Sequence, residues 1–571
     1  FQSIAKHRRP GTPVTSNTSG LPIKDMMEGF DEEFRRHFFV THFFNPVRYM
    51  RLLEIVAGED TDPQVLEAVV AFGSRRLGKG IVYGKDTPNF IANRIGVHGM
   101  MAAMKAMQKH DLNVGEVDAI LGPPMGRPKS AAFRTADLVG LDTFVHVADN
   151  VYDGVLQDEA RELFASPPFL KQMLEKNWLG DKTGQGFYKK VKSEAGKQIF
   201  QLDWRTMDYI ANPKLQADSL KAAKNAPDLP RQLQALVYGQ DKAALFAWDV
   251  VKESLCYAAR RIPEIADDVA NVDRALRWGF GWDMGPFEVW DALGLEKSIV
   301  RMQAEGMEVP EIALRARDAG GFYRWENGIH CYFDVATGKY QPVQQPPGVI
   351  QLRTQKDRNK VLMTNPSASL IDLDDGVLCL EFHCKMNAID ENIIRMIHQS
   401  VDLMERDYEG MVLANEADNF SVGANLLLML MNARARKWEP LEEIVRQFQQ
   451  ANQRLKYSSK PTVAAPVGMA LGGGCEVCLA CNRIQAAAET YIGLVEVGVG
   501  LIPAGGGTKE MLRRLVGTLP NTEMDTFPLV RRALEIVGMA KVATSADEAV
   551  DYGFFTPFDG VSLNRDRRIH D

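Results

Sequence analysis

The chain has 571 residues, too many for one hydrophobic core, and at roughly 100–200 residues per domain it should contain several domains. Its 45% hydrophobic and 25% charged residues and its formal net charge of −7 are typical of a globular protein and argue against a general nucleic-acid binder. The seven cysteines, an odd number, indicate free thiols in a reducing compartment. No signal peptide or membrane-spanning run is recognisable, so the sequence predicts a cytoplasmic protein without stable membrane insertion.

Residues 1–85 alternate between strand-like and helical segments, as expected for part of an α/β sheet. The runs GTPVT, RHFFVTHFF and LLEIV favour strands, and DPQVLEAVVAFGSRRLGK has helical periodicity. The character changes at Asp86. Pro88 is predicted to be the first residue of a helix that is capped by Asp86 or Thr87 and continues to Met107.

Two later segments, about 155 residues apart, resemble each other. Each contains Val-Asp, then Met-Gly, then Asp-x-x-Gly-Leu and a Gly-Phe-Tyr; the tripeptides are Gly186-Phe187-Tyr188 and Gly321-Phe322-Tyr323. This repetition predicts a duplicated helical domain, because a solenoid would need at least about three shorter repeats. The predicted division is 1–85, 86–190 (copy 1), 191–236 (linker), 237–340 (copy 2), 341–354 (Pro-rich linker) and a second α/β domain at 355–571.

The first candidate site lies in the run HFFNP, where His42 precedes Glu54 by twelve residues. If these residues face each other across a turn at Asn45-Pro46, the histidine can remove a proton from an alcohol while the carboxylate fixes its tautomer. Ser19 and Asn93 could hydrogen-bond the same substrate oxygen. Spacing alone leaves the alternative that three of these residues are structural: His42 a packed histidine, Ser19 a turn or cap residue and Asn93 a polar residue on a helix.

The second candidate site contains Glu476, in LGGGCEVCLAC, and Glu496, in YIGLVEVGVGLIPAGGG. Hydration of an enoyl thioester needs a carboxylate to activate water, an acid to protonate the α-carbon and N–H donors for the enolate oxygen. The alternatives are a first-turn acid stabilised by the helix dipole and a solvated strand end. The C-x-x-C-x-x-C run at 475–481 lacks the fourth cysteine of an iron–sulfur pattern and is interpreted as one packed helix face.

Four motifs follow one another along residues 10–330: SNTSGLP, HFFNPVRYMRLLE, KDTPNFIANR and KTGQGFYKK. By these motifs, which occur in the family's order, this part of the chain resembles the L-3-hydroxyacyl-CoA dehydrogenase family. The resemblance implies that His42 is the catalytic base and Glu54 its partner, that Ser19 and Asn93 contact the substrate oxygen, and that Asn45 and Lys182 contact NAD. The family's G-x-G-x-x-G turn is missing, since Gly78-Lys-Gly80 and Gly279-Phe-Gly281 lack the third glycine at the right spacing. The chain is therefore expected to start inside the NAD-binding domain and to bind NAD weakly.

The back of the chain resembles the crotonase family in KMNAID, NFSVGANL, GMALGGGCE and GLIPAGGGTK. By this resemblance the N–H groups of Ala424 and Gly473 form the oxyanion hole, and Glu476 and Glu496 are the acid/base pair of an enoyl-CoA hydratase. Asn425 stands where many members have Asp, which hydration does not require. The chain also ends before the family's last helices, so truncation at both ends is expected, with an oligomer only at full length.

Together these observations predict a multidomain α/β plus all-α protein: a partial Rossmann domain, a duplicated helical dehydrogenase domain and a crotonase-type α/β domain. The predicted function is fatty-acid β-oxidation, with NAD as cofactor, acyl-CoA thioesters as substrates, no metal and, by analogy, a thiolase partner. Two alternatives remain: an active hydratase carried by a degenerate dehydrogenase scaffold, and a non-catalytic acyl-CoA-binding module, which would be expected to have lost the glutamate pair.

Overall fold

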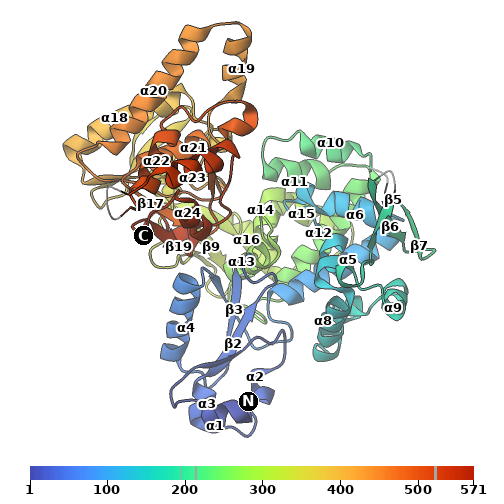
Figure 1. The fold of residues 1–571 in the computed structure, drawn as a ribbon. Helices are drawn as coiled ribbons and strands as arrows, with labels where there is room; N and C mark the ends of the chain where they lie inside the picture. The colour runs from blue at the N-terminus through green and yellow to red at the C-terminus, as the bar shows by residue number, and fades with distance from the viewer. Residues whose placement is uncertain (194–195, 213–214, 520–523) are drawn as a thin grey trace. The chain divides into compact units, whose positions relative to one another are not determined.

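The structure, a computed structural model, describes residues 1–193, 196–212, 215–519 and 524–571 (Figure 1). These residues form two compact units. The first contains 1–74, 79–324 and 330–343, and the second contains 75–78, 325–329 and 344–571. Across the described ranges, every helix is too short or too polar to span a lipid bilayer.

A four-stranded sheet carries the first candidate site (Figure 1). Its order is β1-β2-β3-β4, with β2 antiparallel to β3 and the other two pairs parallel. The strands are β1 (Val14–Ser16), β2 (Phe38–Phe43), β3 (Leu52–Ala57) and β4 (Gly80–Gly84). Five of the six residues of β2 and of β3 are buried, because apolar side chains pack on both faces of these strands. The strands predicted in this region are therefore present, in a mixed sheet.

The rest of the first unit is mainly helical, and one large apolar core joins its helices. The helices up to residue 319 are α1 (Gln2–His7), α2 (Ile23–Met26), α3 (Glu32–Arg36), α4 (Pro63–Arg76), α5 (Ala92–Lys109), α6 (Val114–Leu121), α7 (Phe133–Val139), α8 (Leu141–Gly154), α9 (Pro168–Glu175), α10 (Asp218–Lys224), α11 (Leu229–Val237), α12 (Lys242–Arg260), α13 (Val269–Phe280), α14 (Pro286–Leu293), α15 (Leu295–Ala304) and α16 (Glu311–Ala319). Three short 3-10 helices, η1 (Pro123–Met125), η2 (Arg161–Phe164) and η3 (Asp181–Thr183), lie between them. Two small sheets complete this part of the chain: β5 (Tyr188–Ser193), β6 (Gly196–Asp203) and β7 (Asp208–Ala211), and β8 (Tyr323–Glu326), β9 (Ile329–Asp334) and β10 (Lys339–Pro342).

A buried aspartate makes the same contacts in both copies of the repeated segment. Asp118 on α6 accepts hydrogen bonds from amides at the start of α7 and, at 2.8 Å, from the Tyr188 hydroxyl. Asp273 on α13 accepts from amides at the start of α14 and, also at 2.8 Å, from the Tyr323 hydroxyl. Burial raises the pKa of Asp118 to about 6 and raises that of Asp273 well above its usual value.

A second pair of aspartates repeats in the same way. Asp137 on α7 accepts from the amides of Phe187 and Tyr188 at 2.8 and 2.9 Å. Asp291 on α14 accepts from the corresponding amides of the second Gly-Phe-Tyr, at 2.9 and 2.8 Å. The residues that repeat in the sequence thus make equivalent hydrogen bonds between the helices and the Gly-Phe-Tyr segment of each copy, as expected for a duplicated helical domain.

Two details of the first unit differ from the sequence prediction. The helix expected to start at Pro88 starts at Ala92, because Asn89 and Phe90 have φ of 61° and 48° and form a tight turn before it. Asp86 does not cap this helix; its carboxylate accepts from the Ile23 amide. The predicted linker at 191–236, of which 194–195 and 213–214 lie outside the described residues, contains β6, β7, α10 and most of α11.

The second unit is built on a seven-stranded sheet in the order β11-β12-β13-β14-β15-β17-β19, which is antiparallel as far as β13 and parallel from there on. The strands of this unit are β11 (Val361–Thr364), β12 (Ala368–Asp372), β13 (Val377–Phe382), β14 (Gly410–Ala414), β15 (Thr462–Ala464), β17 (Arg483–Ala487) and β19 (Gly560–Ser562), with a separate parallel pair of β16 (Met469–Leu471) and β18 (Tyr491–Gly493). Its helices are α17 (Leu352–Asp357), α18 (Glu391–Asp407), α19 (Leu426–Arg434), α20 (Trp438–Lys456), α21 (Gly473–Ala480), α22 (Gly507–Val516), α23 (Phe527–Gly538) and α24 (Ala546–Tyr552), with 3-10 turns η4 (Lys385–Asn387), η5 (Glu496–Val499) and η6 (Arg565–Arg567).

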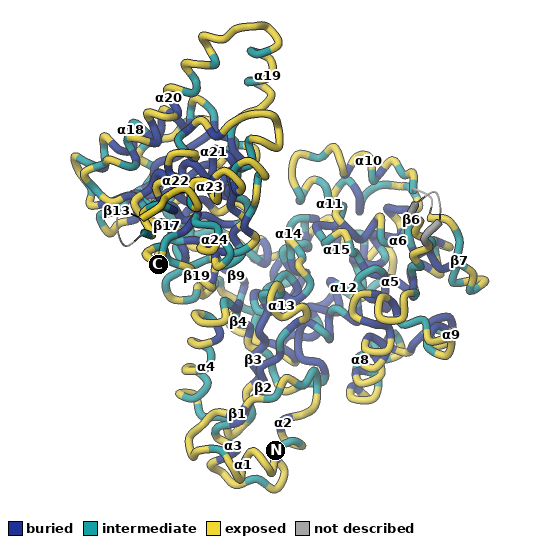
Figure 2. The backbone as a smooth tube through the Cα atoms, viewed as in Figure 1, coloured by how far each residue is buried: buried dark blue, intermediate teal, exposed yellow. Residues whose placement is uncertain are grey.

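The short helix α21 lies at the centre of the second unit, and all eight of its residues are buried (Figure 2). Cys475, Cys478 and Cys481 are buried free thiols, in agreement with the packing interpretation of this run. The change from the first unit to the second, after Val343, falls within the Pro-rich segment at 341–354. The finer domain boundaries stay predictions.

Candidate active sites

His42 and Glu54 face each other on adjacent antiparallel strands, in the register that the twelve-residue spacing predicts. The His42 Nδ1 lies 2.6 Å from the Glu54 Oε2, and both side chains are buried, at 4% and 0% exposure. The other carboxylate oxygen of Glu54 accepts from the amides of Ile91 and Ala92, at 3.2 and 2.8 Å, where α5 begins. Amides at a helix N-terminus attract negative charge, and a carboxylate bonded to an imidazole can fix the tautomer and orientation of that ring.

Aromatic rings pack against the histidine and restrict its orientation. The His42 ring lies edge-on to the rings of Phe44 and Phe90, with centroid distances of 4.7 and 5.7 Å. Phe90 could not be predicted from the sequence, because its position depends on the turn that delays the start of α5. With Nδ1 engaged by Glu54, the Nε2 atom is the one that can exchange a proton with a substrate.

The segments that carry Ser19, Asn45 and Asn93 converge on this pair. The segment of Ser19 is held to β2 through Asn17, whose side chain accepts from the Phe43 amide at 2.9 Å. Asn45 follows β2 directly, before a cis peptide bond to Pro46, and Asn93 lies in the first turn of α5. Asn45 thus adjoins Phe44, which packs against His42, and Asn93 adjoins Ala92, whose amide donates to Glu54.

Lys182 is not brought to this pair by any contact that the structure describes. It lies in η3, and its ammonium group forms an ion pair with Asp142 in the first turn of α8. The two side chains are about half exposed, so the ion pair is weak and can open.

Glu476 lies in α21, directly after the glycine-rich turn that the sequence singled out. Its Oε1 accepts from the Gly507 amide at 2.8 Å, and the amides of Gly505 and Gly506 also favour its charged form. Burial and, next, the charge of Glu496 raise the pKa of Glu476 to about 7. The carboxyl group can therefore gain or lose a proton near neutral pH, as an acid or base in catalysis must.

Glu496 begins η5, and both of its carboxylate oxygens are buried without a hydrogen-bond partner from another residue. Burial raises its pKa. Its Oε1 approaches Gly472, where an added Cβ would lie 3.3 Å away, so it points at the turn that starts α21. An unpartnered buried carboxylate is costly, and it marks a position where a water or substrate group is expected.

The two residues predicted for the oxyanion hole lie side by side. An added Cβ on Gly423, next to Ala424, would lie 3.3 Å from the Gly473 nitrogen. Gly473 is the first residue of α21, and such a position has no carbonyl partner for its N–H within the helix. Ala424, Gly473, Glu476 and Glu496 are thus grouped around one turn.

Helix α20 supports this site in a way that the sequence did not indicate. Its Gln449 and Asn452 side chains donate to the carbonyls of Ala504 and Gly505, at 2.7 and 2.8 Å. Both contacts join residues more than fifty positions apart in the sequence. The sequence of α20 by itself shows only the pattern of an amphipathic helix.

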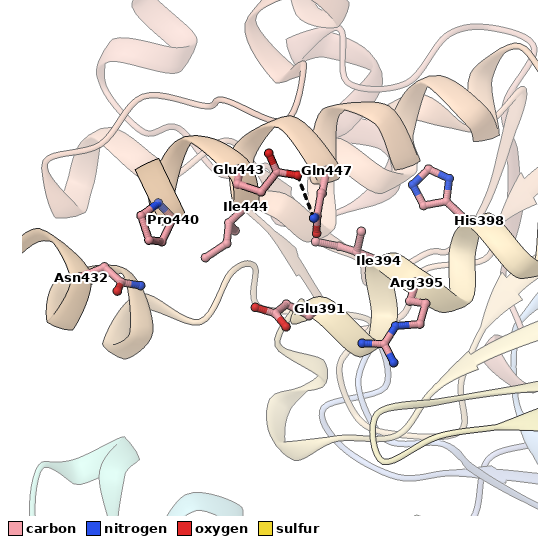
Figure 3. A pocket seen from close by; sticks show the side chains of 9 residues that line it. All are labelled: Glu391, Ile394, Arg395, His398, Asn432, Pro440, Glu443, Ile444 and Gln447. Atoms are coloured by element: carbon pink, nitrogen blue, oxygen red, sulfur yellow. Dashed lines mark hydrogen bonds between the residues drawn. The ribbon is translucent and has the colours of Figure 1, made fainter. Parts of the chain in front are cut away.

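A separate pocket of about 520 Å³ is lined by residues of α18, α19 and α20. Figure 3 shows Glu443 and Gln447 hydrogen-bonded to each other along α20 and facing residues of α18. None of the predicted site residues lines this pocket; its lining consists of Glu391, Ile394, Arg395, His398, Asn432, Pro440, Glu443, Ile444 and Gln447.

Three family models match the chain. The NAD-binding domain of 3-hydroxyacyl-CoA dehydrogenase matches residues 1–87, the C-terminal domain of the same enzyme matches 90–190, and the enoyl-CoA hydratase/isomerase model matches 373–539. A Bacillus subtilis protein named "Probable 3-hydroxyacyl-CoA dehydrogenase" is 47% identical over 578 residues, which cover 100% of this chain and 71% of that protein. A Rickettsia felis protein, whose name assigns it provisionally to the fatty acid oxidation complex as a trifunctional enzyme, is 28% identical over 97% of this chain and 71% of its own length. A solved structure of enoyl-CoA hydratase subunit I from Geobacillus kaustophilus is 28% identical and covers 34% of this chain and 69% of that one, with a TM-score of 0.28.

The fold and the matching family models define a multidomain enzyme. The chain belongs to the 3-hydroxyacyl-CoA dehydrogenase family, and it carries an enoyl-CoA hydratase/isomerase domain after the dehydrogenase domains. This confirms the prediction of a multifunctional enzyme of fatty-acid oxidation, and no match favours a degenerate dehydrogenase. The NAD-binding domain implies the use of NAD(H).

Proposed function

We propose that the second unit hydrates trans-2-enoyl-CoA at the start of α21, between Glu476 and Glu496. Glu476, held by loop amides that favour its charge, takes a proton from water as the hydroxyl group adds to C3. Glu496, whose pKa is raised by burial, gives a proton to C2. The N–H groups of Ala424 and Gly473 hold the thioester oxygen while it carries the enolate charge.

The observation that carries this proposal is the unpartnered, buried carboxylate of Glu496 beside the free N–H end of α21. The test is the loss of the enoyl-thioester absorbance when crotonyl-CoA is mixed with the chain. Glu476→Gln and Glu496→Gln should each reduce the rate by at least about 10²-fold, since each removes one proton-transfer group. Hydration that persists in both variants would refute the assignment.

We also propose that the first unit oxidises 3-hydroxyacyl-CoA, on the strength of the 2.6 Å contact between His42 and Glu54. His42 takes the hydroxyl proton through Nε2, and Glu54 stabilises the resulting imidazolium. Ser19 and Asn93 are proposed contacts of the substrate oxygen.

NAD would accept the hydride in this reaction. The residues of this chain could contact NAD away from its pyrophosphate, because this sequence contains no G-x-G-x-x-G turn to hold the pyrophosphate. Asn45, directly after β2, is a proposed contact, and Lys182 becomes one only if its ion pair with Asp142 opens.

The dehydrogenase proposal is tested in the reverse direction, by NADH consumption with acetoacetyl-CoA at high NADH concentration. Turnover by the wild-type chain should fall by at least about 10²-fold in His42→Gln. Hydratase activity in the same preparation is the control for folding. Acyl-CoA substrates for both centres, a thiolase partner, an oligomer and a cytoplasmic location are further proposals. Gel filtration with and without a thiolase would test the two assembly proposals.

A further inference from the structure

The loop that holds Glu476 is itself held by one face of α20. Asn452 is buried, at 5% exposure, and its Nδ2 donates to the Gly505 carbonyl at 2.8 Å. One turn earlier, Gln449 donates to the Ala504 carbonyl at 2.7 Å. Two successive peptide groups of the loop are therefore anchored by side chains of a single helix.

Phe448 on the same helix touches both parts of the site. A Cβ added to Gly505 would lie 2.3 Å from its ring, and a Cβ added to Gly473 would lie 3.4 Å from it. The ring thus fills the space between the loop and the oxyanion turn, and neither can move toward the other.

Asn452 is connected to the Glu476 carboxylate through the loop at Gly505. The Gly505 carbonyl that Asn452 binds belongs to the residue whose amide, with those of Gly506 and Gly507, faces the Glu476 carboxylate. A Cβ on Gly505 would lie 2.6 Å from the Glu476 Oε2, so loop and carboxylate are in contact and a displacement of one must displace the other.

We propose that Asn452 is a positioning residue for the hydration reaction: through the Gly505 carbonyl it holds the loop amides against Glu476. The inference rests on the proposed hydratase function and deepens it. Asn452 acts through the loop, by its hydrogen bond to the Gly505 carbonyl.

The amide group of Asn452 is not explained by packing. Its Oδ1 is buried without a hydrogen-bond partner, which costs free energy. A leucine of similar size would fill the site without that cost, so Asn452→Leu should fold. What the leucine cannot do is donate to the loop.

The test compares Asn452→Leu, Asn452→Asp and the control Gln453→Leu, an exposed position on the same helix, with the wild-type chain. Asn452→Leu should lower kcat for crotonyl-CoA about tenfold and change KM less than about threefold, because the loop positions the base and does not bind CoA. The pH–rate profile should also shift, with the ionisation of Glu476 moving to higher pH as it loses amide donors. The control should match the wild type.

Asn452→Asp separates positioning from a merely structural role. An ionised aspartate cannot donate to the Gly505 carbonyl, whereas a protonated one can. The ratio of its kcat to that of Asn452→Leu should therefore rise as the pH falls from 8 to 6. If either Asn452 variant fails to fold, Gln449→Ala at the exposed neighbouring anchor should still lower kcat about threefold with unchanged KM.

This inference, but not the proposed function, would be overturned if folded Asn452→Leu had an unchanged kcat and an unshifted pH profile. The same holds for Gln449→Ala where that variant is used. The proposed function would then stand if Glu476→Gln still abolished hydration. No hydration by the wild-type chain would overturn both.

Discussion

The buried carboxyl group of Glu476 should make the second unit less stable as the pH rises from 4 to 8. Its pKa is raised from 4.5 to about 7, so the folded state binds this proton more tightly than the unfolded chain does. Its contribution to stability is complete below pH 4.5 and is lost as the pH rises through 7. The difference between the two pKa values corresponds to roughly 3 kcal/mol of unfolding free energy over this range.

Glu476→Gln is neutral at every pH and should lack this dependence. The difference in unfolding free energy between the variant and the wild type should therefore grow by about 3 kcal/mol in favour of the variant between pH 4 and pH 8. Native-state hydrogen exchange of the α21 amides, followed by mass spectrometry, measures this locally and does not require the two units to unfold together.

Glu510 on α22 provides a matched control of opposite sign. Burial would raise its pKa, but hydrogen bonds from Lys456, Lys509 and Arg513 lower it to about 2. Its contribution is present above pH 4.5 and is lost as the pH falls toward 2, so Glu510→Gln should lose stability relative to wild type slightly more at pH 8 than at pH 4. A constant difference between Glu476→Gln and the wild type at pH 4 and pH 8 would refute the reasoning.

Three further results are expected. Gly505→Ala places a Cβ 2.3 Å from the Phe448 ring, so it should lower hydratase kcat by at least about 10²-fold and destabilise the second unit by about 1–3 kcal/mol in urea unfolding. The control Gly538→Ala, which has open space around it, should change neither kcat nor stability. Glu54→Gln should reduce NADH turnover about 10²-fold in the absorbance assay and leave hydration unchanged; equal loss of both activities would contradict separate centres. Asp273→Ala should cost about 3 kcal/mol in thermal unfolding of the first unit, because it leaves two amides and a hydroxyl without their acceptor.

The sequence predicted those features that depend on local spacing. Twelve residues and one turn are enough to put His42 opposite Glu54 on two adjacent antiparallel strands. Glu476 was located by the glycine turn before it, since a tight turn and a helix start are encoded within a few residues.

Features that depend on distant contacts were not predictable. The delayed start of α5 depends on two non-glycine residues with positive φ, Asn89 and Phe90, and propensity favoured a helix there. The role of Asn452 depends on a contact across 53 positions, and nothing in an amphipathic helix distinguishes it from its polar neighbours. The ion pair of Lys182 with Asp142 was hidden for the same reason.

Glu54 uses one oxygen for the histidine and the other for the first amides of α5. Glu54 therefore holds the His42 ring in one orientation and tautomer only while α5 is packed on the sheet. If the first turn of α5 unfolds, the Glu54 carboxylate loses the two amides that position it. The orientation of His42 thus depends on Ile91 and Ala92, which lie about fifty residues further along the chain and donate to Glu54 rather than to the ring or its strand.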